Sequence, residues 1–308
     1  AAYAEPVTDW SQEERFIYHA GEEGVTLNEE ATADAIEKAL EQGEFVCTVE
    51  ATVNAVLPGG NIDDLKAATS FIASYTTKFS ARRDDEVKQN RKFNIQKAAD
   101  IINGNTIQPG EEWSFNTVVG PRTYELGWKG ANGISGGKEY TIQAGGGICQ
   151  VSTTLYNALL CANMEIVDRR AHTIPSDYVP VGLDATVDTR GIDFVWKNNT
   201  DMPAYIFARV EKVEGSSSRH TITVYVYGKP LPEGVTYQSR NEIIEERSRQ
   251  DEAIYTNDAS IPTGYQLERV QGHKYYVAEA YQDKYVDGKL AELSLIHISE
   301  PTRQAEIS

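Results

Sequence analysis

The stretch Gly145-Gly146-Gly147-Ile148-Cys149-Gln150-Val151-Ser152-Thr153-Thr154-Leu155-Tyr156 leads three glycines directly into a cysteine. Mainly apolar residues then recur at helical spacing and predict an α-helix, namely Ile148, Val151, Ser152, Leu155, Leu159 and Ala162. Cys149 falls in its first turn, where unpaired backbone N–H groups and the positive end of the helix dipole favour a thiolate. The stretch therefore predicts Cys149 as a nucleophile. The alternative is a small buried apolar residue at a helix start.

Two residues after this helix suit the partners that a cysteine nucleophile needs. His172 can hold the thiol proton near neutral pH, and Asp184 can accept from the other ring N–H and so fix the orientation of the imidazole. The three residues follow in the order helix start, extended segment, extended segment. Alternatively, His172 bonds a loop carbonyl, and Asp184 is a turn residue after Gly182. The catalytic hypothesis is a Cys149–His172–Asp184 triad.

Residues around the cysteine are candidates for binding a substrate. The three glycines at 145–147 let a substrate approach the sulfur closely. Backbone N–H groups near residues 148–150 would stabilise a developing oxyanion, and the side-chain amide of Gln150 is a candidate for the same task. Arg122 could line a cleft beside Cys149, the alternative being a surface charge on a loop.

Several of these stretches resemble the core of the VanW family. The resemblance rests on seven segments, Gly145–Tyr156, His172–Pro175, Val179–Val187, Asp193–Thr200, Phe93–Ile95, Ile107–Asn116 and Gly120–Thr123. Thr173 and Leu183 depart from the residues common in the family, and neither belongs to the predicted triad. The resemblance implies a bacterial cell-envelope protein associated by name with glycopeptide resistance. It implies no reaction, so the triad is a hypothesis drawn from the residues themselves.

The predicted fold class is α+β, with a small N-terminal α/β domain, a central VanW-like domain and a truncated β-rich extension. Residues 1–92, with helices expected at 32–41 and 62–75 and a strand at 45–53, resemble the peptidoglycan-binding domain that commonly precedes VanW domains. Residues 93–228 are the VanW-like domain, with strands expected near 166–172, 185–189, 192–197, 203–210 and 220–227, the last two forming a hairpin. Residues 229–292 resemble a truncated β-rich module. Residues 293–308 resemble a translated sequencing adapter, foreign to the fold.

The composition of the chain narrows the classes of partner. A net charge of −17 over 308 residues argues against binding nucleic acid and against docking on anionic lipid. The sequence has no apolar run long enough to span a membrane and no secretory signal peptide, so membrane attachment is expected only through an N-terminal anchor missing from this chain. Three cysteines and five histidines build neither a disulfide framework nor a zinc site, and Cys47 is expected in a strand core. No metal or cofactor is expected.

These observations, with the resemblance, predict a protein at the extracellular face of the cytoplasmic membrane or in the cell wall. Its expected partner is peptidoglycan or its stem peptide. Two function classes stay open. One is a cysteine-dependent acyl-transfer enzyme, a hydrolase or transpeptidase, which needs the Cys149 sulfur near a His172 nitrogen and a cleft in front of them. The other is a non-catalytic binding or scaffold protein, in which Cys149 is sealed in apolar packing.

Overall fold

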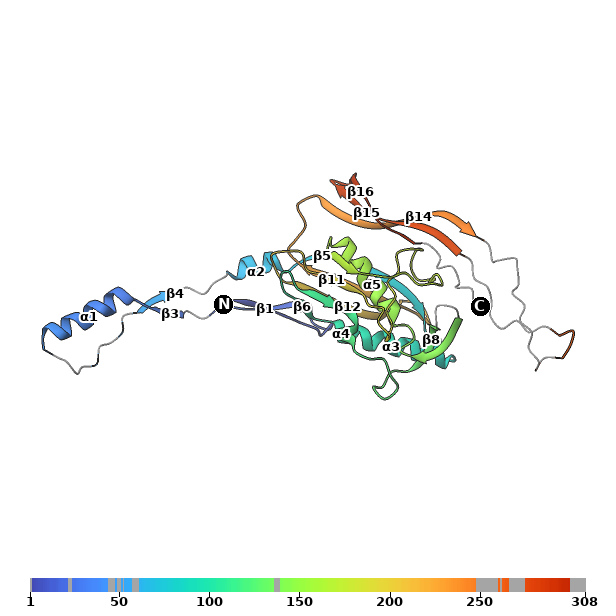
Figure 1. The fold of residues 1–308 in the computed structure, drawn as a ribbon, viewed down its shortest axis with the longest axis horizontal. Helices are drawn as coiled ribbons and strands as arrows, with labels where there is room; N and C mark the ends of the chain where they lie inside the picture. Colours follow the sequence, from blue (N-terminus) through green and yellow to red (C-terminus); the bar gives the residue numbers. More distant parts are fainter. Residues whose placement is uncertain are drawn as a thin grey trace. The chain divides into compact units, whose positions relative to one another are not determined.

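The computed structural model describes residues 2–21, 24–43, 48, 51, 53–56, 61–135, 139–247, 260, 262–265 and 275–299, and Figure 1 shows their fold. The chain divides into two compact units, residues 1–69 and residues 70–308. Helices and mostly antiparallel sheets are both present, which confirms the predicted α+β class.

The first unit consists of two short hairpins and two helices. Strand β1 (Tyr3–Pro6) pairs with β2 (Phe16–His19), and β3 (Gly24–Leu27) pairs with β4 (Val53–Val56). The helices are α1 (Glu29–Glu41) and α2 (Ile62–Ala68), and each begins after an asparagine whose side chain accepts a backbone N–H of the first turn. The predicted strand at 45–53 and Cys47 fall largely outside the described residues.

The helix predicted at 62–75 ends at Ala68, and a long strand follows it directly. This strand, β5 (Ser70–Ser80), pairs with β13 along its whole length. Leu65, Thr69, Ile72 and Ala73 fit one side of a helix by their spacing, but pairing with a partner far along the chain overrides that local pattern. The division between the compact units falls after Thr69, and the domain boundary expected after residue 92 stays a prediction.

A four-stranded antiparallel sheet forms the centre of the second unit. Its strand order is β5-β13-β12-β6, with β6 (Asn105–Ile107), β12 (Ala204–Lys212) and β13 (Arg219–Gly228). Strands β12 and β13 form the predicted hairpin, paired from Tyr205 with Tyr227 to Lys212 with His220. The alternation of β-branched and aromatic residues in both strands explains this pairing.

Two helices cover one face of this sheet. Helix α5 (Ile148–Cys161) lies against β5 and β13, and α3 (Glu86–Ile102) lies against β12 (Figure 1). Their apolar residues share one buried core with alternate residues of the strands, such as Ile206, Val224 and Val226. The burial of these apolar side chains is the main favourable contribution to the stability of the unit. Among the described helices, none combines the length and apolar character needed to cross a lipid bilayer.

Smaller elements frame the central core. Strands β10 (Glu165–Asp168), β11 (Val195–Lys197) and β7 (Glu112–Ser114) form a second antiparallel sheet in that order, and helix α4 (Phe115–Val119) follows β7. Strands β8 (Gly130–Ser135) and β9 (Glu139–Ala144) form a hairpin that leads to the glycines. The strand predicted at 166–172 ends at Asp168, and residues 185–189 are not a strand. The backbone there bonds to α5 side chains instead of a neighbouring strand.

A three-stranded sheet, β14 (Val235–Arg247), β15 (Tyr275–Val286) and β16 (Lys289–Ser299), covers the other side of α5 (Figure 1). Ser239 donates to the side chain of Asn157, and Gln282 donates to the carbonyl of Leu160. In β16, Leu295 is 49% exposed and Ile296 is partly buried against the core. The foreign origin of the residues from 293 on stays a prediction.

A candidate cysteine–histidine–aspartate site

Cys149 is the second residue of α5 and is partly buried against the core. Gly147 is the residue that caps the start of α5. Its φ of +105° is a backbone conformation that residues other than glycine rarely adopt. A side chain on Gly146 would collide with the backbone of Ala131 in β8. The structure thus gives these glycines a packing role, which brings α5 close to β8, and their contact with a substrate stays a prediction.

The structure brings the three residues of the predicted triad together. The His172 Nδ1 atom lies 2.5 Å from Asp184 Oδ2, and the backbone N–H of His172 donates to the same oxygen at 2.6 Å. The Cys149 thiol donates to the carbonyl of Val187 at 3.4 Å and lies 3.7 Å from the hydroxyl of Thr186, and the His172 ring is close enough to lower the pKa of the thiol. Because Nδ1 faces the carboxylate, Nε2 is the ring nitrogen left for the sulfur. His172 therefore interacts with both the Asp184 carboxylate and the thiol of the candidate nucleophile, as the predicted triad requires.

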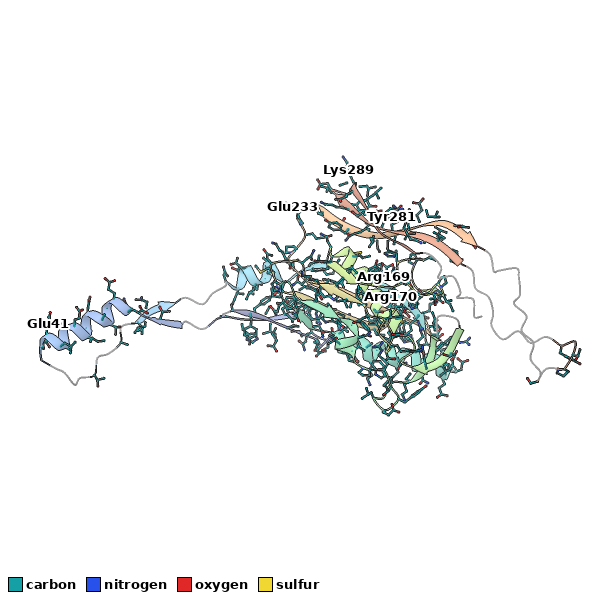
Figure 2. All side chains as sticks on the ribbon, in the orientation of Figure 1. Glu41, Arg169, Arg170, Glu233, Tyr281 and Lys289 are labelled. Atoms are coloured by element: carbon teal, nitrogen blue, oxygen red, sulfur yellow. The ribbon has the colours of Figure 1, made fainter. Side chains whose placement is uncertain are left out.

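A buried arginine holds Asp184 from the other side. Arg169, labelled in Figure 2, follows β10 and places Nη2 3.3 Å from Asp184 Oδ1. It also donates to the backbone carbonyls of Asp184 and Gly182 at 2.5 and 2.6 Å. The side chains of Asp184, His172 and Arg169 are only 6–8% exposed. Asp184 thus has a neighbour on each carboxylate oxygen and little freedom to turn.

Polar side chains of α5 fix the backbone that carries Asp184. Ser152 donates to the carbonyl of Ala185 at 2.6 Å, and the hydroxyl of Thr153 accepts the Ala185 N–H at 2.9 Å. Asn157 donates to the carbonyl of Leu183 at 2.7 Å. One helix therefore carries the candidate nucleophile and also positions the aspartate. This role of Thr153 and Asn157 was not predicted from the sequence, although polar residues on an otherwise apolar helix indicate hydrogen bonds to neighbouring segments.

Electrostatics favour an ionised cysteine–histidine pair. Burial alone would raise the pKa of the Cys149 thiol, but the hydrogen bond and positive charge of His172 outweigh it and lower that pKa to about 7. Burial opposes the charge on His172 as well, but Asp184 and the thiolate raise its pKa to about 10. The pKa of Asp184 is lowered, because His172 and Arg169 outweigh its burial. Between about pH 7 and 10 the pair is therefore a thiolate beside an imidazolium.

The start of α5 offers a donor for a developing negative charge. The first N–H groups of a helix lack partners within it. Those of Ile148 and Gln150 donate to the carbonyls of Gly145 and Gly147, whereas the described residues provide no backbone acceptor for the N–H of Cys149. This N–H lies on the nucleophile itself, which is where acyl-transfer enzymes place an oxyanion donor.

The two remaining predicted residues differ in their placement. Gln150 is fully buried, and its amide donates to Thr77 Oγ1 and Lys78 O in β5, so it supports packing and is not available to an oxyanion. Arg122 is buried beside the site, and its stem lies against Gly145. The alternative in which Arg122 is a surface charge on a loop is therefore wrong.

Other features of the surroundings were not visible in the sequence. Tyr178 lies near the thiolate, and its burial together with that negative charge raises the pKa of its phenol. A hollow on α3 is lined by Phe93, Gln96, Lys97, Asp100 and Ile101, and its lining does not include Cys149. Within the described parts of the chain, no three His, Cys, Asp or Glu side chains gather as metal ligands.

Comparisons with known proteins agree with the resemblance described above. Residues 90–222 match the model of the family described as VanW like protein. An uncharacterized protein of Bacillus subtilis (strain 168), YoaR, is 40% identical over 158 residues, which are 51% of this chain and 48% of that protein. The vancomycin B-type resistance protein VanW of Enterococcus faecalis (strain ATCC 700802 / V583) is 32% identical over 135 residues, 42% of this chain and 49% of that protein. The chain thus spans about half the length of these relatives, and no solved structure matches it.

Proposed function

We propose that this chain, whose residues 90–222 are a VanW domain, is a cysteine-dependent acyl-transfer enzyme of the bacterial cell envelope. One observation carries the proposal. The His172 ring contacts the Asp184 carboxylate through Nδ1, at 2.5 Å, and the same ring lowers the pKa of the Cys149 thiol. A histidine that merely bonded a loop carbonyl would leave the thiol with its ordinary or raised pKa.

The geometry supports a two-step reaction. The Cys149 thiolate attacks an amide carbonyl, and a bond forms between sulfur and the acyl carbon. The imidazolium of His172 gives its proton to the leaving amine as the carbon–nitrogen bond breaks, while Asp184 holds the ring. Water, or a second amine, then attacks the thioester with His172 as base and releases the thiol. Hydrolysis and transpeptidation differ only in this acceptor.

The proposed substrate is the stem peptide of peptidoglycan. Support comes from the name of one matched relative, a vancomycin B-type resistance protein, and from the amide chemistry of the triad. The net charge of −17 argues against nucleic acid as the partner. We place the protein at the outer face of the cytoplasmic membrane or in the cell wall, where this substrate is found.

The test uses the whole chain and two matched cysteine variants. Release of amines from purified peptidoglycan fragments is measured for the native protein, for Cys149→Ala and for Cys161→Ala. We expect activity in the native protein and in Cys161→Ala, and none in Cys149→Ala. Activity that survives Cys149→Ala would overturn the proposed mechanism. Binding to cell wall without any turnover would instead assign the chain to the non-catalytic binding class.

A further inference from the structure

A buried arginine stands beside the candidate nucleophile without a carboxylate in contact. Arg122 is 8% exposed. Its Nη1 donates to the side-chain oxygen of Asn116 at 2.7 Å and to the carbonyl of Gly120 at 3.1 Å, and both acceptors are neutral. The ion pairs of the described residues do not include Arg122. A buried guanidinium normally has a carboxylate partner, so its absence here needs a reason.

The position of Arg122 links it to Cys149. Its Cβ and Cγ atoms pack against Gly145, where an added Cβ would approach them to 2.8 and 3.0 Å. Burial lowers the pKa of the Arg122 guanidinium, and the negative charges of the Cys149 thiolate, Asp188 and Asp193 oppose that shift. Asp188 directly follows Val187, whose carbonyl lies 3.4 Å from the Cys149 sulfur. Arg122 therefore packs against the glycine segment that leads to Cys149, and its charge lies close enough to interact with the sulfur.

The guanidinium keeps part of its donor set free. Five N–H groups point outward from an arginine in a planar fork, and the described residues accept only from those on Nη1. The donors of Nε and Nη2 have no acceptor in the described part of the chain. Such a fork binds carboxylates and phosphates in a bidentate manner. The nearby Asp188 and Asp193 disfavour a doubly charged phosphate more than a singly charged carboxylate.

We propose that Arg122 anchors a carboxylate of the substrate next to the carbonyl that Cys149 attacks. This inference rests on the proposed acyl-transfer function and narrows its substrate class to peptides with a free carboxylate a few bonds from the scissile amide. Arg122 is then a specificity-determining residue. A stem peptide that ends in a free carboxylate meets this requirement, and the same peptide ending in an amide does not.

The test compares two alkylating reagents of similar size. Iodoacetate carries a carboxylate and iodoacetamide a neutral amide; with either, the thiolate forms a bond to carbon and iodide leaves. The rate of alkylation at Cys149 is followed by mass spectrometry of the Cys149 peptide near pH 7.5. The ratio of the two rates is divided by the same ratio for a free cysteine peptide. We expect a normalised preference for iodoacetate of about tenfold, saturating with concentration and suppressed by acetate.

Two arginine variants and one control give the decisive comparison. Arg122→Gln should reduce the normalised ratio to about one, and Arg122→Lys should give an intermediate value, because a lysine keeps the charge without the fork. Arg190→Gln, an exposed arginine on the neighbouring loop, should keep the preference. Changes in the thiolate fraction affect both reagents equally and cancel in the ratio.

The outcomes separate this inference from the function on which it rests. If Cys149 reacts rapidly near neutral pH but with a normalised ratio of one in the native protein, the carboxylate anchor is overturned and the activated cysteine is not. If Cys149 reacts with both reagents only at alkaline pH, the proposed function itself fails. Saturation and acetate competition are measured on the native chain, so the test stands even where Arg122→Gln does not fold.

Discussion

Cys149 and Cys161 stand at opposite ends of the same helix, and both are partly buried. At the start of α5, His172 lowers the pKa of the Cys149 thiol to about 7. At its end, burial raises the pKa of the Cys161 thiol, and the nearby backbone of Ser239 offsets this only in part. The end of a helix dipole also disfavours an anion, whereas its start favours one.

The comparison shows that burial alone does not decide the pKa of these two thiols. Burial raises the pKa of either thiol, and it is the leading influence in both cases. The difference comes from a charged partner, which Cys149 has in His172 and which Cys161 does not have among the groups that shift its pKa. The lowered pKa of the Cys149 thiol thus depends on the neighbouring irregular segment that carries His172 as much as on the helix.

Removing the nucleophile should produce the largest effect. Cys149→Ala is expected to reduce turnover of peptidoglycan fragments by at least about a thousandfold, because covalent catalysis is lost entirely. Cys161→Ala should retain most of the activity. The thermal midpoint of both variants, measured by circular dichroism, controls for folding. If both variants lose the same share of turnover, the two cysteines of α5 do not differ in function.

Removing the histidine should make Cys149 resemble Cys161. In His172→Ala the hydrogen bond and the positive charge are gone, so burial should raise the thiol pKa to its ordinary value or above. Alkylation of Cys149 by iodoacetamide at pH 7 should then slow roughly 10- to 50-fold, as the thiolate fraction falls. Alkylation of Cys161 in the same samples serves as the internal control, and a lasting difference between the two rates would contradict the role of His172.

The rates of alkylation and of turnover at Cys149 should depend differently on pH. Alkylation of the native protein should rise through a midpoint near the thiol pKa of about 7 and then stay level. Turnover should rise over the same range but fall again near pH 10, because His172 loses the proton that it gives to the leaving amine. Rates measured from pH 5 to 11, within the stable range of the fold, test both limbs. If turnover does not fall at high pH, His172 is not the general acid.

Substituting the aspartate should have a smaller effect than substituting the histidine. In Asp184→Asn the ring loses its carboxylate partner, so the pKa of His172 should fall, and the alkaline limb of turnover should move to lower pH. The loss of turnover is expected to be on the order of 100-fold, because the thiol and the base remain. The shift of the alkaline limb is the measurement of choice, since a merely structural role would lower the rate without moving it.

The smallest effect is expected where the C-terminal sheet supports the site. Asn157 donates to the Leu183 carbonyl and accepts from Ser239, and Leu183 packs with Val179 and Ala280. Asn157→Ala should lower the free energy of unfolding by about 1–2 kcal/mol and raise the thiol pKa slightly, and Ser239→Ala should cost less than about 1 kcal/mol. Asn199→Ala, at an exposed amide, is the control in urea unfolding. If Asn157→Ala unfolds at the same urea concentration as this control, the C-terminal sheet does not support the site through Asn157.

The sequence was sufficient for features that depend on local patterns and on chemistry. Helical spacing after Cys149 predicted α5, and alternation predicted the hairpin of β12 and β13. The types of residue needed by a thiol nucleophile selected His172 and Asp184, although both lie in irregular backbone and not in extended strands. That backbone is held by side chains of α5, and such bonds between distant segments have no period in the sequence.

Other features depended on long-range partners. The segment Ser70–Ser80 fits a helical spacing over its first residues, and only its pairing with β13 makes it a strand. Gln150 is adjacent to the nucleophile in sequence, yet helical geometry turns its amide toward β5. Adjacent residues on a helix face different sides, so nearness in sequence is a poor guide to a site on α5.

The burial of α5 on all sides has a further consequence for how the site responds to heat. Twelve of its fourteen residues are buried between two sheets, so its amide protons should exchange with solvent only when the whole unit opens. The segment with His172 lacks regular structure and is held by hydrogen bonds to the Asp184 side chain, so we expect it to open at a lower free energy than the helix. Warming should therefore separate base from nucleophile while the helix is still intact, and inactivation would precede denaturation.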